Sequence, residues 1–170
     1  MKNLTIVFTR SKKKFAIASK IIMWWMGTDY SHCAREFNIF DFHMYYQASE
    51  GRVNYESEHI FNQKHTIICK YTVEINDQDH NAIVKSCLKE VGIRYGFMQN
   101  IGIVYVWVVF KLLKKSIDNP WKKGKNCSEL ILPLLQKIFP NEFSNLNPNT
   151  VTPKDLQTRL EDLKQLGSII

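Results

Sequence analysis

The order in which strand-like and helix-like segments follow one another is the feature that most restricts how this chain folds. Runs rich in β-branched and aromatic residues occupy 4–9, 31–40, 42–48, 52–61 and 65–75. Helical periodicity marks 13–26 and then most of the second half, at 76–91, 95–115, 126–139 and 152–163. The runs from 31 to 61 follow one another through short turns, which favours antiparallel pairing. We therefore predict an α+β fold in which an antiparallel sheet packs against helices.

A single domain over residues 1–170 is expected, because the sequence shows no repeat and no linker and is long enough to bury one core. The helix at 13–26 is apolar on most of its surface, so we predict that it is largely buried. The valines within 95–115 also make a strand possible there.

Two apolar runs, 15–26 and 101–113, could be mistaken for membrane spans. Lys20 interrupts the first and Lys111 the second, and both fall short of the ~20 residues of a span. We predict no transmembrane span and leave a peripheral membrane contact open.

Charge and cysteine usage narrow the classes of partner. With 23 Lys+Arg against 16 Asp+Glu the formal net charge is +7, which admits an anionic partner. The lysines are dispersed, and no nucleic-acid motif or stripe of alternating basic and aromatic residues is present, so we expect no specific nucleic-acid binding. The four cysteines form no CxxC pair and lack zinc-site spacing, so we expect free thiols, no metal and no cofactor. The apolar run Leu4–Phe8 is too short for a signal peptide, which predicts a cytoplasmic protein.

Cys127 has the best local setting for a nucleophile among the four cysteines. It begins the predicted helix at 126–139, with Asn126 as N-cap and Glu129 three residues on. The first turn of a helix favours a negative sulfur, and its backbone N–H groups can hold an oxyanion. The lysines just before it, among 122–125, add positive potential. The same setting also suits a structural cysteine beside a solvated lysine loop, so the local pattern leaves both interpretations open.

Among the five histidines, His32 has the most suggestive position. It opens a predicted strand straight after a tight turn, with Ser31 before it. His43 begins the next strand and is its main rival, whereas His59, His65 and His80 are predicted to lie at the surface. Cys33 follows His32 directly and should point to the opposite face of the strand. A strand histidine is often purely structural, so this position alone does not establish a base.

Five short motifs occur in an order typical of one family. They are Ser31-His32, Tyr95-Gly96, Asn119-Pro120-Trp121, Cys127-Ser128-Glu129-Leu130 and Thr152-Pro153-Lys154-Asp155-Leu156. Together they span most of the chain. In this order the sequence resembles the circularly permuted papain-like hydrolases of the NlpC superfamily, the YiiX-like group. The resemblance implies a papain-like fold in which the histidine strand precedes the cysteine helix. Related permuted enzymes include the lecithin:retinol acyltransferase type.

The resemblance also assigns roles to residues. It implies Cys127 as nucleophile, His32 as general base and Gln47 as the third catalytic residue, with Tyr95, Ser31 and Ser128 at the substrate. The family has Glu where this chain has Gln47. An amide can accept a hydrogen bond from the imidazole, but it cannot stabilise the imidazolium by charge. Gly96 likewise replaces an Asp that is more usual after the tyrosine.

The expected function is that of a cysteine hydrolase of the amidase or peptidase type. Cys127 would attack an acyl carbonyl, and water would then release the acyl group. The resemblance implies a peptide such as a cell-wall (peptidoglycan) peptide as substrate, or a lipid acyl group in lipid-active relatives. Two alternatives stay open: a catalytically silent copy of the fold that serves as a structural or binding module, for example in a virus or phage particle, and a basic nucleic-acid-binding protein.

Overall fold

The computed structural model describes residues 1–13, 17–39, 42–49, 51–115, 117–121 and 124–170, without the side chains of residues 18 and 97–100. The first half of the chain contains five strands and two helices: β1 (Lys2–Ser11), α1 (Ile17–Met26), β2 (His32–Ile39), β3 (Phe42–Ser49), β4 (Arg52–Ser57), α2 (Glu58–Lys64) and β5 (His65–Ile75). The second half is helical, with α3 (Asp77–Glu90), α4 (Phe97–Leu113), α5 (Cys127–Ile138), α6 (Pro140–Phe143) and α7 (Pro153–Gln165). The predicted α+β fold is confirmed.

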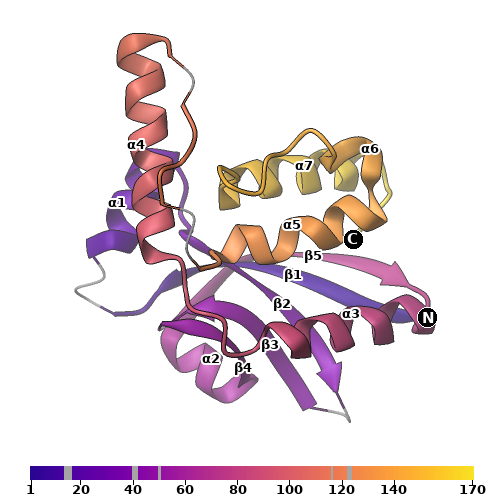
Figure 1. The fold of residues 1–170 in the computed structure, drawn as a ribbon. Helices are drawn as coiled ribbons and strands as arrows, with labels where there is room; N and C mark the ends of the chain where they lie inside the picture. The colour runs from indigo at the N-terminus through magenta and orange to yellow at the C-terminus, as the bar shows by residue number, and fades with distance from the viewer. Residues whose placement is uncertain (14–16, 40–41, 50, 116, 122–123) are drawn as a thin grey trace.

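The five strands form one antiparallel sheet in the order β4-β3-β2-β1-β5. The hairpin partners β2, β3 and β4 lie next to one another, and β5 returns to pair with β1 at the other edge (Figure 1). In this register Thr9 pairs with His32 and Phe8 with Cys33. The start of β2 is therefore held against the end of β1, which fixes the position of His32.

Helices cover the two faces of the sheet unequally. One face packs against α3, α5 and α7 and carries the main core, in which Phe8, Cys33 and Tyr46 meet the buried leucines of α5. The opposite face carries a smaller cluster of Val7, Ala34, Tyr45 and Phe61, the last from α2. Alternate residues of a strand point to opposite faces. Cys33 therefore faces α5, while Ala34 faces α2.

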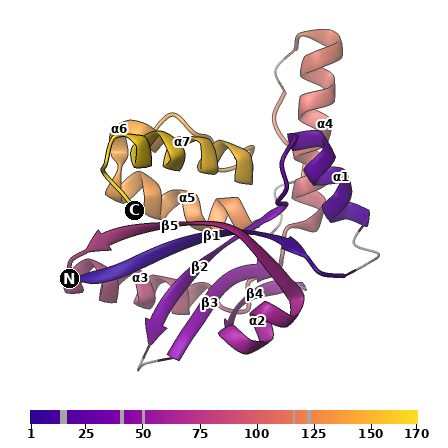
Figure 2. The same ribbon diagram turned by 180° about the vertical axis from the view of Figure 1, so that it is seen from behind.

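Two predictions about the first half were wrong. Residues 52–61 are not one strand, because β4 ends at Ser57 and α2 begins at Glu58, so that Phe61 is buried from a helix. The helix α1 is not largely buried, since Ile17, Ile21 and Trp24 are exposed. Its apolar composition suggested a core helix, but α1 lies beyond the end of the sheet beside α4 and covers neither face (Figures 1 and 2).

The longest helix, α4, stands away from the sheet, and the segment after it returns along its side (Figure 1). Its base is fixed by Asn119, whose side chain donates to Asn149 O at 3.3 Å and accepts from Trp121 N at 3.0 Å. Asn119 is buried so close to Gly102 that a Cβ there would lie 1.8 Å from its Oδ1. Only glycine permits this approach, so the Asn119-Pro120-Trp121 motif anchors α4 to the body.

Candidate active site

The entry into α5 places Cys127 at the first position of the helix. Asn126 is the N-cap, and its Oδ1 accepts a hydrogen bond from Glu129 N at 2.8 Å. Gly124 lets the chain enter at this angle, because it has φ +92° and a Cβ would lie 2.6 Å from Arg94 O. The N–H groups of Cys127 and Ser128 belong to the same first turn, which has no carbonyl partners within the helix. They are the natural donors for an oxyanion at this position.

His32, the first residue of β2, is nearly fully buried beside the start of α5. Its Nε2 lies 2.8 Å from Gln47 Oε1, a distance within the usual range for a hydrogen bond. An amide oxygen can only accept, so Nε2 carries the proton and Nδ1 is left to face Cys127. Gln47 thus sits behind the imidazole, where the sequence resemblance placed the third residue.

Cys127 and His32 are close neighbours, and each shifts the other's pKa. Burial lowers the pKa of His32, but the Cys127 sulfur and the Gln47 hydrogen bond outweigh burial and raise it above its usual value. The pKa of Cys127 lies well below its usual value, because hydrogen bonds from Cys33 and His32 stabilise its charged form against burial. Both shifts favour a thiolate beside an imidazolium, which is the reactive form of a cysteine.

Cys33 adds a contact that the sequence did not reveal. Its Sγ lies 3.8 Å from Ser128 Oγ, and its thiol is close enough to Cys127 to lower the pKa of that residue. Burial and the neighbouring Cys127 raise the pKa of Cys33 well above its usual value, so Cys33 stays protonated. A protonated thiol can donate to the Cys127 sulfur. Cys33 therefore acts on Cys127 as a donor, although it points away from His32 along the strand.

Three aromatic rings stack in series against the imidazole of His32. His65 stacks on His32 with ring centroids 5.3 Å apart, and Phe61 stacks on His65 at 4.7 Å. Phe61 in turn stacks on Tyr45 at 4.0 Å. The prediction that His65 lies at the surface was wrong, because β5 pairs with β1 and brings the start of β5 next to the start of β2. No local sequence signal connects His65 with His32.

Glu56 supplies negative charge near His32 that Gln47 lacks. The buried Glu56 carboxylate contributes to raising the pKa of His32, and Lys64 is paired with it at 2.7 Å. It comes from β4, two strands away from β2 in the sheet. A carboxylate near an imidazole stabilises its protonated form by charge, even without a hydrogen bond between the two. The sequence could not reveal it, since Glu56 resembles any acidic residue of an edge strand.

Two of the three predicted substrate-contact residues line a hollow over Cys127, and the third does not. Ser31 and Ser128 both line a small hollow over Cys127, together with Asn126. The Ser128 side chain is buried and directed at Cys33, and Ser31 is hydrogen-bonded to Ser19 of α1. Tyr95 is half-buried and pairs through its backbone with Lys125, two residues before Cys127. It does not line that hollow.

The remaining histidines lie away from Cys127. His43, the rival of His32, is half exposed and lies 3.4 Å from Glu36. His80 was predicted to be at the surface and is instead buried on α3, where its ring meets Phe37. The predicted surface position was wrong because α3 packs over the main core with its His80 side inward. Neither residue is among the groups that shift the pKa of Cys127.

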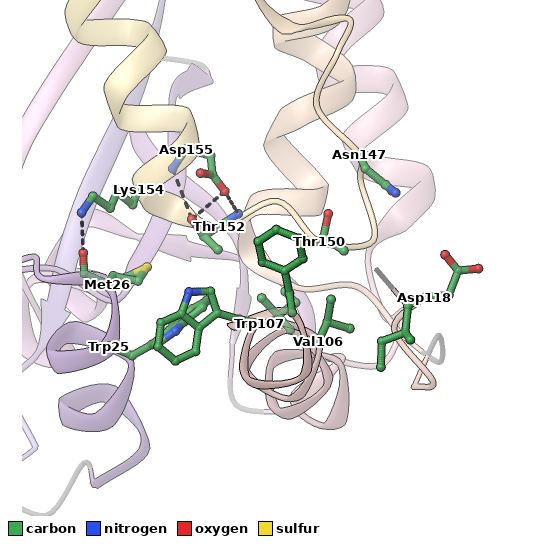
Figure 3. A pocket seen from close by; sticks show the side chains of 13 residues that line it. Trp25, Met26, Val106, Trp107, Asp118, Asn147, Thr150, Thr152, Lys154 and Asp155 are labelled. Atoms are coloured by element: carbon green, nitrogen blue, oxygen red, sulfur yellow. Dashed lines mark hydrogen bonds between the residues drawn. The ribbon is translucent and has the colours of Figure 1, made fainter. Parts of the chain in front are cut away.

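A larger groove opens next to the hollow over Cys127. Trp25, Met26, Ile103 and Thr152 line both, so the two adjoin each other. The groove has a volume of about 510 Å³ and lies between α1, α4 and the start of α7 (Figure 3). Its walls meet where Trp25 and Trp107 pack edge to face at 5.9 Å. Apolar and polar side chains line this groove, and Cys127 lies in the adjoining hollow.

Comparison with known proteins gives one structural likeness. The chain aligns with the crystal structure of the metalloprotein YiiX from Escherichia coli O157:H7 (DUF1105), with a TM-score of 0.54 and 18% identity over 93% of this chain and 81% of that one. This likeness shows a YiiX-like fold. No protein-family model matches the chain, and no curated protein matches its sequence.

The description of YiiX as a metalloprotein prompts the question whether this chain offers a metal site. Within the part of the chain that the structure describes, no group of three or more His, Cys, Asp or Glu side chains is placed to hold a metal ion. The cysteines there are all free thiols. The residues around Cys127 thus fit a thiolate–imidazolium pair better than a coordination sphere.

Proposed function

We propose that this protein is a cysteine hydrolase of the permuted papain-like type, with Cys127 as nucleophile and His32 as general base. The single observation that carries the proposal is the buried contact of these two side chains, with Gln47 Oε1 2.8 Å behind the imidazole. A YiiX-like fold with the histidine strand before the cysteine helix supports it. The family implies amides such as cell-wall peptides as one substrate class.

The proposed reaction has two stages, acylation of Cys127 and hydrolysis of the resulting thioester. His32 Nδ1 takes the thiol proton, and the Cys127 sulfur attacks the acyl carbonyl to form a tetrahedral oxyanion near the first N–H groups of α5. The imidazolium returns its proton to the leaving amine or alcohol as the C–N or C–O bond breaks. Water, deprotonated by His32, then cleaves the thioester and restores the thiol. Gln47 holds the ring in the required tautomer throughout, since its oxygen accepts from Nε2.

An activity probe tests this assignment. An alkyne-tagged chloroacetamide should label Cys127 selectively at neutral pH, and labelling should be abolished in Cys127→Ala and strongly reduced in His32→Ala. Cys69→Ala is the matched control, because this half-buried thiol lies on β5 away from the site and burial raises its pKa. Equal labelling of wild type and His32→Ala would refute the dyad and favour a silent copy of the fold.

The aromatic side chains of the groove favour a second candidate, hydrolysis of a lipid acyl group. Trp25, Trp107 and Phe110 line the groove that adjoins the hollow over Cys127, and such side chains can hold an alkyl chain. Thioesters or esters of increasing chain length separate the two candidates. A kcat/KM that rises steeply from a two-carbon to a ten-carbon acyl group supports a lipid substrate, whereas a flat series together with cleavage of wall-peptide amides supports the amidase.

A further inference from the structure

The outer part of α4 is apolar on all sides and yet exposed. Leu112 is 74% exposed and Leu113 70%, and the exposed side chains of Tyr105, Trp107 and Phe110 precede them. A helix that is hydrophobic all round is normally buried in a core or a membrane. Here α4 projects away from the sheet, so the body of the protein does not cover its outer turns (Figures 1 and 2).

The neighbouring helix α1 extends the same surface. Trp24 is 84% exposed, and Ile17 and Ile21 are also exposed on this helix. The two helices lie side by side in both views, joined through the contact of Trp25 with Trp107 (Figures 1 and 2). We call this paired surface of 17–26 and 105–115 the α1–α4 projection. It is too large and too continuous to be a set of isolated exposed apolar residues.

The charges of the α1–α4 projection are of one sign. Neither α1 nor α4 contains an acidic residue, whereas Lys20 lies on α1 and Lys111 on α4. Lys114 and Lys115 follow the tip of α4 and are exposed. The Lys111 ammonium lies 4.8 Å from the Trp107 ring centroid, so its charge stays beside an aromatic ring rather than an acid. An anionic surface complements this pattern.

Together these features suit the interface of a lipid bilayer. Tryptophan and tyrosine prefer the headgroup level, leucines prefer the acyl region, and lysines attract anionic headgroups. No helix in the described ranges is long and apolar enough to cross a membrane. The nine residues from Tyr105 to Leu113 extend roughly 13 Å at 1.5 Å per residue, somewhat more than the ~5–10 Å that interfacial helices enter a bilayer.

We propose that the α1–α4 projection docks the protein onto an anionic lipid bilayer, with the tip of α4 inserted among the acyl chains. The groove between these helices then lies at the membrane surface, and it adjoins the hollow over Cys127. The docking depends on exposed side chains and not on the chemistry of Cys127. It therefore stands or falls independently of the proposed hydrolase activity.

Co-sedimentation of the full chain with phosphatidylcholine vesicles, with and without one third phosphatidylglycerol, tests the docking. We expect binding to the anionic vesicles that weakens with salt, and a blue shift of tryptophan fluorescence. The double variant Leu112→Ser/Leu113→Ser should bind about tenfold less or weaker still, because two leucines leave the apolar phase. Charge reversal by Lys114→Glu/Lys115→Glu should weaken binding more than about fivefold.

Matched controls carry the same change elsewhere on the surface. Leu88→Ser on α3 and Leu166→Ser after α7 remove leucines that are 58% and 78% exposed and lie away from the projection, and both variants should bind like wild type. Cys127→Ala should also bind like wild type. Failure of the folded wild type to bind, or equal binding by the tip variant, would overturn the proposal. So would a wild-type dimer that the tip variant converts to a monomer, since a second copy would then cover the surface.

Discussion

Replacing Gln47 by Leu isolates what this residue does for His32. Leucine keeps much of the buried volume but removes the acceptor that lies 2.8 Å from Nε2. A hydrogen bond to a charged group contributes about 1.5–3 kcal/mol, and one to a neutral group about 0.5–1.5 kcal/mol. Loss of the acceptor therefore destabilises the imidazolium more than the neutral ring, by about 1–1.5 kcal/mol.

This difference predicts a measurable shift. About 1.4 kcal/mol corresponds to one pKa unit, so the thiolate of Cys127 should form at a pH roughly one unit higher in Gln47→Leu. The assay is the rate of iodoacetamide alkylation of Cys127 as a function of pH, followed by mass spectrometry of the peptide. At pH values below the transition, the alkylation rate should fall about tenfold.

The charged variant gives the opposite sign. Gln47→Glu would place a carboxylate against the imidazolium, so the alkylation profile should move to lower pH. The same variant should be less stable than wild type, because Gln47 Nε2 has no hydrogen-bond partner among the described residues and a carboxylate oxygen in its place would be buried without a donor. A Gln47→Leu profile that superposes on wild type, while His32→Ala shifts it, would refute the role assigned to Gln47. Near-ultraviolet circular dichroism checks that each variant is folded.

Three further predictions address the surroundings of the site. Cys33→Ala should raise the pKa of Cys127 and move its alkylation profile to higher pH. Cys33→Ser keeps a donor and should shift the profile less. An unchanged profile in both variants would contradict the donor role of Cys33. Asn126→Ala should lower the free energy of unfolding in urea by about 0.5–2 kcal/mol through loss of the cap, and Asn126→Asp should restore most of it. Burial alone would raise the pKa of Glu90, but hydrogen bonds from Lys125 and Tyr46 outweigh it and hold the pKa below its usual value. This stabilisation is present above the unfolded-state pKa near 4.5 and is lost as pH falls through the lower folded-state value, so wild type should lose more stability than Glu90→Gln between pH 6 and pH 3.

Local patterns predicted most elements, whereas the pairing of Cys127 with His32 came from the family resemblance. The starts of three helices could be predicted because an N-cap is a local feature. Asn76, Asn126 and Thr152 each accept a hydrogen bond from the backbone N–H three residues on. The strands of the sheet were readable because β-branched and aromatic runs alternate with turns. Residues 14–16, 40–41, 50 and 122–123, which include the predicted start of the first helix, the turn at Asp41 and two of the lysines before Cys127, lie outside the described residues.

Contacts across strands and helices were beyond local patterns. The stack of His65 on His32 depends on the pairing of β5 with β1, and the charge of Glu56 reaches His32 across the sheet. The donor Cys33 was dismissed because alternation turns it from His32, but α5 crosses over that face and brings Cys127 to it. Each of these depends on long-range register, which no single segment encodes.

The sequence by itself determined the α+β class, the capped helix that begins at Cys127 and the strand that begins at His32, because propensity and capping act over a few residues. Only the tertiary structure decided that these two starts meet, and that α1 and α4 lie outside the core. An apolar helix in a sequence is equally suited to a core and to a membrane surface. Whether such a helix is buried or exposed depends on whether the fold packs it against the sheet or lets it project, as α4 does.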